Sequence, residues 1–185
     1  MTNRRSTVLS LLCALGCAVP ASAATCESLA SLALPDTTIT SAQAVAAGAF
    51  TPPPGGFPSA ISAKNLPAFC RVAATIRPSK DSDIKIEVWL PMDGWNGKFE
   101  GVGNGGWIGA IVYPALMEAL SRGYVAAGTD TGHAGGVMDG SFALGHPEKV
   151  IDFGYRAVHE MTVKGKAITK AFYDKAPRYS YWNGC

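Results

Sequence analysis

Long apolar stretches, strong net charge and blocks of like charge are all missing from this 185-residue sequence. Charged residues make up only 16% of the chain and the formal net charge is +2. With no basic stripe, a nucleic-acid partner is not expected. No internal repeat is present, so nothing points to a repeat architecture. Hydrophobic residues reach 48%, which is typical of a globular protein with a core, and the length favours one domain.

The longest apolar run lies near the N-terminus and covers Val8 to Val19. It is shorter than the ~20 apolar residues that a membrane-spanning helix needs. Arg4 and Arg5 precede it, and the small-x-small sequence of residues 21–23 follows it. This pattern predicts a signal peptide over residues 1–23. We therefore expect a secreted or periplasmic protein with no membrane contact after cleavage.

Two other export routes are less favoured by the same segment. A lipoprotein anchor at Cys17 would need a lipobox, and Ala14-Leu15-Gly16 is a poor one. The paired arginines suggest twin-arginine export, but the residues after them fit that signal badly. General secretion remains the preferred interpretation.

A secreted protein is expected to contain disulfides, since these bonds persist in an oxidising compartment. Cys13 and Cys17 belong to the predicted signal peptide, which leaves Cys26, Cys70 and Cys185. An odd number means a free thiol, an intermolecular bond or a missing partner. We predict a disulfide between Cys26 and Cys70, and for Cys185 a partner outside this chain.

The mature chain divides by composition near residue 70. Residues 24–69 are rich in Ala, Ser, Thr and Pro and are expected to form an N-terminal wrapping segment and linker. Within them, residues 50–60 carry too much proline for a helix or a central strand. Residues 70–185 are assigned to the N-terminal part of a catalytic domain. They begin with two alternating segments around a polar turn, which predict an antiparallel hairpin.

Strands and helices then alternate, which predicts a parallel sheet with right-handed crossovers. Gly123 is expected to end the first helix and Asp152 to cap the start of the second. Lys164, Lys166 and Lys170 are expected to face solvent. The expected strands are 98–103, 124–130 and 179–183, and the expected helices are 113–123 and 152–177.

The last two residues are typical of the turn that follows a nucleophile strand. In an α/β-hydrolase the motif G-x-S-x-G allows a tight strand-to-helix turn that exposes the serine oxygen. Gly184 and Cys185 match its first two positions. We therefore predict an α/β-hydrolase fold, cut just before the nucleophile serine, which is expected directly after Cys185.

Four motifs in order resemble the tannase/feruloyl esterase family of secreted α/β-hydrolases. They are "WNGKFEGVGNGGWIG", "GYVAAGTDTGH", "DFGYRAVHEMT" and "YSYWNGC", which together span about ninety residues. The resemblance implies that Cys185 pairs with a cysteine that follows the catalytic histidine, downstream of this chain. It also implies a lid domain with a structural Ca²⁺ after the nucleophile, and no cofactor within residues 1–185.

Few residues of the chain itself are candidates for chemistry. The glycine-rich loop after residues 98–103 predicts an oxyanion hole with Gly105 or Gly106 as donor. Trp107 is expected to line the acyl pocket or to fill the core. Asp130 and His133 are expected to shape a loop beside the site. All three histidines precede the turn, so none is assigned as general base, and no spacing suggests a metal site.

The sequence thus predicts a serine carboxylic-ester hydrolase that acts on small aromatic or phenolic esters through an acyl-enzyme. Another secreted serine hydrolase, such as a lipase or a polyester or aryl-diester esterase, is the first alternative. A non-catalytic secreted binding module is the second. Because nucleophile, acid and base are not among its residues, the 185-residue chain alone is expected to be inactive.

Overall fold

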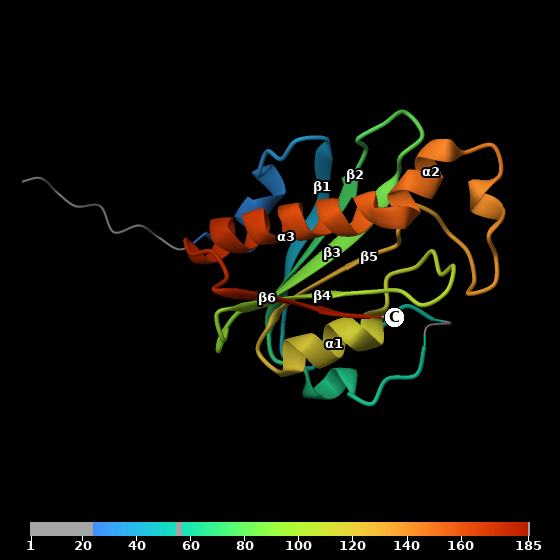
Figure 1. Cartoon of the computed structure of the whole chain (residues 1–185). Helices are drawn as coiled ribbons and strands as arrows, with labels where there is room; N and C mark the ends of the chain where they lie inside the picture. Colours follow the sequence, from blue (N-terminus) through green and yellow to red (C-terminus); the bar gives the residue numbers. More distant parts are fainter. Residues whose placement is uncertain (1–23, 55–56, 185) are drawn as a thin grey trace, which may run out of the picture.

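The structure is a computed structural model that describes residues 24–54 and 57–184. The predicted signal peptide and Cys185 therefore lie outside the described residues. One mixed sheet of six strands forms the centre of the molecule, with helices on both of its faces (Figure 1). Among the described residues, no helix is both long enough and apolar enough to cross a membrane.

The predicted hairpin is confirmed. Strand β2 (Phe69–Ile76) pairs antiparallel with β3 (Ile84–Pro91) in a register without bulges. Both faces of β3 are buried because helices cover both sides of the sheet at this position.

A carboxylate is buried on one of these faces, and it is fully paired. Glu87 is 4% exposed and accepts hydrogen bonds from Arg71 Nε at 2.8 Å, Trp89 Nε1 at 2.7 Å and the Tyr113 hydroxyl at 2.8 Å. Burial, together with the nearby carboxylate, raises the pKa of Tyr113 to about 12. Since buried charges persist only when paired and hydrogen-bonded, this network joins β2, β3 and the first long helix into one unit.

The parallel part of the sheet is also confirmed. Its strands are β4 (Lys98–Val102), β5 (Val125–Thr129) and β6 (Tyr179–Asn183). β4 lies between the other two and is parallel to both, while β5 is antiparallel to β3. Helix α1 (Tyr113–Ser121) connects β4 to β5 and is followed by Gly123, whose φ of +77° is the left-handed conformation expected after a helix end.

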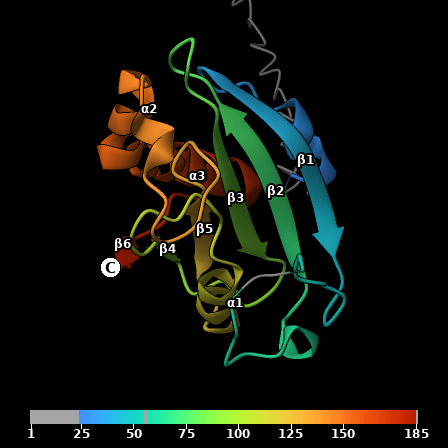
Figure 2. The same ribbon diagram turned by 90° about the vertical axis from the view of Figure 1, so that its right-hand side faces the viewer.

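One strand lies where no strand is expected from the sequence. β1 (Thr37–Val45) pairs antiparallel with β2 and completes the order β1-β2-β3-β5-β4-β6 (Figure 2). Only Ala42 of this strand is buried. Its small and polar residues leave a weak alternation, which explains why composition alone indicates a wrapping segment here. Three short 3-10 helices complete the loops: η1 (Glu27–Ser31), η2 (Ala63–Asn65) and η3 (Ser141–Ala143).

The start of the second long helix differs from the prediction. Helix α2 (Pro147–Ile151) runs through a π-helical turn, η4 (Asp152–Arg156), into α3 (Ala157–Tyr173). Asp152 is not an N-cap: its backbone is helical, and its fully buried side chain accepts from Arg156 at 3.0 Å. The helix begins five residues earlier because Pro147 suits a first helical position, where no N–H is needed.

Lys164 also departs from the expectation of a solvent-facing lysine. It is 7% exposed and pairs with Glu160, one turn earlier, at 2.8 Å. Lys170 is exposed as expected, and Lys166 is partly buried. A lysine can be buried in this way when its ammonium group is paired and its apolar stem packs on the neighbouring surface.

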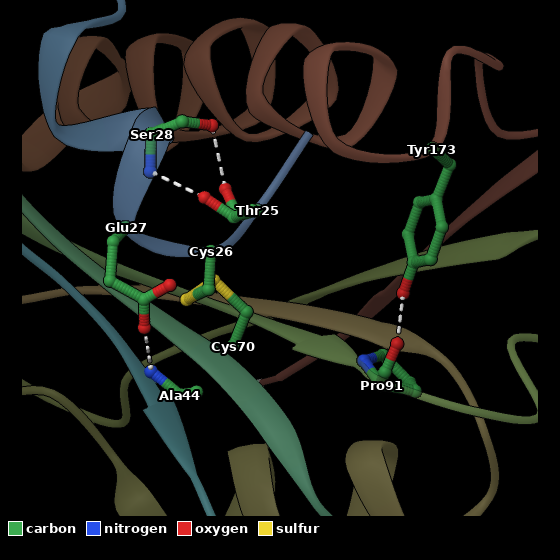
Figure 3. The surroundings of a disulfide bond; sticks show 8 residues. All are labelled: Thr25, Cys26, Glu27, Ser28, Ala44, Cys70, Pro91 and Tyr173. Carbon is green, nitrogen blue, oxygen red and sulfur yellow. Dashed lines mark hydrogen bonds between the residues drawn. A yellow bond between two sulfur atoms is a disulfide. The ribbon is translucent and has the colours of Figure 1, made fainter. Parts of the chain in front are cut away.

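The disulfide between Cys26 and Cys70 is confirmed, and Figure 3 shows its surroundings. The two Cα atoms are 5.5 Å apart and the residues are separated by 44 positions. Both cysteines are almost fully buried. Next to them, Glu27 accepts a hydrogen bond from the Ala44 N–H at 3.2 Å, so η1 is held against both β1 and β2 (Figure 3).

Candidate active site

The ends of β4 and β6 leave the sheet together. Val102 and Asn183 are register partners, and the Gly103 N–H donates to the Asn183 carbonyl at 2.8 Å. Gly184 lies directly against Gly103: a Cβ atom on Gly184 would be 2.8 Å from the Gly103 Cα. The chain that leads into Cys185 therefore touches the first residue of the loop after β4.

This loop, residues 103–109, is called the glycine loop below. The φ of Gly106 is +56°, and a Cβ atom there would be 2.7 Å from the Val137 carbonyl oxygen, so only glycine fits. Around a Cβ on Gly105 there is open space. In the described part of the chain, the N–H groups of Gly105 and Gly106 have no hydrogen-bond acceptor. This is compatible with the predicted role as oxyanion donors, which stays a prediction.

Asn104 holds the glycine loop in shape, a role that the sequence analysis missed. Its side-chain Nδ2 lies 2.6 Å from the carbonyl oxygen of Ala110, 3.2 Å from that of Thr129 and 3.3 Å from that of Ile108. One amide group thus links the loop to the end of β5. The only available signal was its position between glycines, because its partners are distant in the sequence.

Replacing Asn104 with aspartate is expected to lower the free energy of unfolding by about 2 kcal/mol, since a carboxylate cannot donate and leaves these carbonyls unsatisfied. Chemical denaturation of the variant measures the loss. Asn65→Asp is the matched control, because Asn65 is exposed at the end of η2. Equal destabilisation of the two variants would contradict the assigned role of Asn104.

Trp107 lies at the surface and not in the core. Its side chain is 46% exposed, and its ring packs against Phe153, with centroids 5.1 Å apart, and against Phe142 at 6.1 Å. The exposed position does not agree with the expectation that Trp107 fills the core. It is compatible with a wall of the acyl pocket, and this pocket role stays a prediction.

His133 contacts the glycine loop from the end of β5. It is 8% exposed, its Nε2 lies 2.9 Å from the Trp107 carbonyl oxygen, and its ring stacks on Phe142 at 3.7 Å. The other two histidines lie in different surroundings. His146 pairs with Asp81 at 2.9 Å, and His159 is exposed on α3.

Asp130 shapes the turn that carries His133. Its Oδ1 accepts the backbone N–H groups of Lys85 and Gly132, both at 2.9 Å. Burial raises the pKa of this carboxyl to about 6, against the opposing effect of the two N–H donors. No hydrogen bond joins Asp130 to His133 among the described side chains, so the two do not form an acid–base pair.

Comparison with known proteins now decides the family. A sequence model described as tannase and feruloyl esterase matches residues 70–185. The chain belongs to the tannase and feruloyl esterase family. The matched residues include β2 from its second residue and all of β3 to β6, and thus the glycine loop, the His133 turn and the end of β6.

Curated proteins that are similar to this chain match it over only part of their own length. An uncharacterized esterase of Xanthomonas campestris is 45% identical over 184 residues, which is 98% of this chain and 31% of that protein. A probable feruloyl esterase B-1 of Neosartorya fischeri is 39% identical over 137 residues, or 74% of this chain and 25% of that protein. The chain thus spans about a third of the length of its relatives or less.

Solved structures establish the fold of this tannase and feruloyl esterase chain as that of an α/β-hydrolase. Feruloyl esterase B from Aspergillus oryzae superposes with a TM-score of 0.76 and 36% identity, over 86% of this chain and 31% of that one. The tannin acyl hydrolase from Aspergillus niger gives a TM-score of 0.59 at 24% identity, over 84% and 30%, and supports the fold alone.

Proposed function

We propose that this chain is part of a longer, secreted serine carboxylic-ester hydrolase that acts on aromatic or phenolic esters through an acyl-enzyme. One observation carries the proposal: in a member of the tannase and feruloyl esterase family, Gly184 lies against Gly103, and the free N–H groups of Gly105 and Gly106 follow directly. This arrangement supports the proposal, because acyl transfer needs a nucleophile close to donors for the developing oxyanion.

In the proposed reaction, the serine after Cys185 attacks the ester carbonyl and the alcohol leaves, which forms an acyl-enzyme that water then hydrolyses. An N–H group of Gly105 or Gly106, with the N–H of the residue after the serine, stabilises the negative oxygen of each tetrahedral intermediate. The acid and the histidine base are expected later in the chain, since hydrolases of this fold run in the order Ser, acid, His. Cys185 is expected to pair with a cysteine near that histidine.

The family resemblance implies a structural calcium ion in a lid domain that is expected after the nucleophile. No group of three or more His, Cys, Asp or Glu side chains is arranged to hold a metal within residues 24–54 and 57–184. The proposed ligands of the ion lie in that lid, downstream of Cys185.

Export to an oxidising compartment belongs to the same proposal. The buried disulfide at the start of the described chain supports it, because such bonds persist outside the reducing cytosol. Cleavage after Ala23 would leave Ala24 as the first residue, two positions before Cys26. N-terminal sequencing of the exported protein tests this point, and an uncut N-terminus would contradict it.

The activity is tested with the full-length protein on methyl ferulate, methyl gallate and a p-nitrophenyl ester. We expect hydrolysis of aromatic esters and covalent labelling by a fluorophosphonate on the serine after Cys185. Residues 1–185 alone are expected to show neither. Turnover of long-chain lipid esters only would favour the lipase alternative. Absence of any turnover and any labelling would favour the binding module.

A further inference from the structure

We propose that His133 is a positioning residue for the oxyanion hole: its imidazole N–H fixes the Trp107 peptide and so orients the N–H groups of Gly105 and Gly106. This inference rests on the proposed function and assigns His133 a role that is exerted through the glycine loop. It starts from a buried polar side chain that the mechanism above does not use.

The hydrogen bond defines which ring nitrogen donates to the glycine loop. His133 Nε2 lies 2.9 Å from the Trp107 carbonyl oxygen, which can only accept a hydrogen bond, so Nε2 carries the hydrogen. Nδ1 faces the Thr131 hydroxyl at 3.3 Å. The ring therefore donates to the glycine loop through Nε2.

The Trp107 peptide groups are held from two sides. The Trp107 N–H donates to the Val137 carbonyl at 2.9 Å, and its own carbonyl accepts from His133. Two residues further, the Gly109 N–H donates to the Gly135 carbonyl at 3.0 Å, and a Cβ there would be 2.6 Å from His133 Cδ2. Gly105 and Gly106 directly precede Trp107. Without these hydrogen bonds to Trp107, their glycine backbone would sample many conformations.

Packing alone does not explain a histidine at this position. The ring stacks on Phe142 at 3.7 Å with an interplanar angle of 17°, and it meets Phe153 edge to face at 5.7 Å. A phenylalanine would keep these aromatic contacts but leave the Trp107 carbonyl without its donor. A glutamine would lose the ring but carry an N–H group at a similar reach. The two substitutions therefore separate the hydrogen bond from the packing.

The experiment compares His133→Phe and His133→Gln in the full-length protein with His159→Phe, the same change at an exposed histidine of α3. For His133→Phe we expect kcat on methyl ferulate to fall about 30-fold, less than the 10²–10³-fold loss of a whole oxyanion donor, with KM within about threefold. His133→Gln is expected to stay within about fivefold of the wild type, and His159→Phe to be unchanged. Amide hydrogen exchange of residues 105–108 is expected to be faster in His133→Phe only.

Three results would overturn the inference while the wild type still hydrolyses esters. These are an unchanged kcat in His133→Phe, an equal loss in His133→Gln, or a change confined to KM. If the wild type shows no turnover, the proposed function fails, and hydrogen exchange still decides the positioning role. Equal exchange rates at residues 105–108 in all variants would then overturn it.

Discussion

Replacing Gly184 with alanine is expected to lower kcat/KM of the full-length protein by about 100-fold, because a displacement near 1 Å between reacting groups can cost that much. The new Cβ would lie 2.8 Å from the Gly103 Cα and 3.1 Å from the Gly103 nitrogen. These are backbone atoms, and the Gly103 N–H is already bonded to Asn183. The clash can be relieved only if the end of β6 moves away from the glycine loop.

Gly154→Ala is the matched control for this prediction. Gly154 is exposed in η4, and a Cβ atom there would contact nothing within 4 Å. We expect its kcat/KM to equal that of the wild type. A Gly184→Ala protein within threefold of the wild type would show that the contact between β6 and the glycine loop does not position the nucleophile.

Removal of the disulfide by Cys26→Ala with Cys70→Ala is expected to lower the free energy of unfolding by about 4 kcal/mol in the chain-entropy model for a loop of this size. Both side chains are buried, and the alanine methyl group adds no polar atom that burial would leave unsatisfied. Denaturant titration of the oxidised protein and the variant measures the difference.

The same variant is expected to keep its kcat while it is folded. The disulfide and the candidate site lie at opposite ends of the sheet strands. Cys70 is the register partner of Leu90 in β3, which lies near the start of β5. The glycine loop and His133 follow the carboxyl ends of β4 and β5. The reduced wild type serves as the control and should match the variant in stability. Two thiols that alkylate readily in the untreated protein would contradict the bond itself.

The sequence predicted those parts of the fold whose signals are local. Alternation at Ile84, Ile86 and Val88 predicted the hairpin, and the continuous apolar run before Asp130 predicted a strand that is buried on both faces. Glycines at 105 and 106 marked the loop, and cysteine counting paired Cys26 with Cys70.

Several of the errors and omissions depend on contacts with residues that are distant in the sequence. Asp152 has the residue type of an N-cap, yet it packs beneath Gly132 and pairs with Arg156. The carbonyls that Asn104 satisfies and the bond from His133 to Trp107 depend on the tertiary fold. No local periodicity encodes such contacts.

The two edge strands of the sheet, β1 and β6, differ in how readily a further strand can pair with them. β1 carries a register irregularity between Ile39 and Ser41, of the kind that discourages strand addition at an edge. β6 pairs regularly with β4 and presents Tyr179, Tyr181 and Trp182, each about half exposed. A further strand of the same protein is therefore expected to pair beside β6, while the irregular β1 disfavours strand addition at the opposite edge.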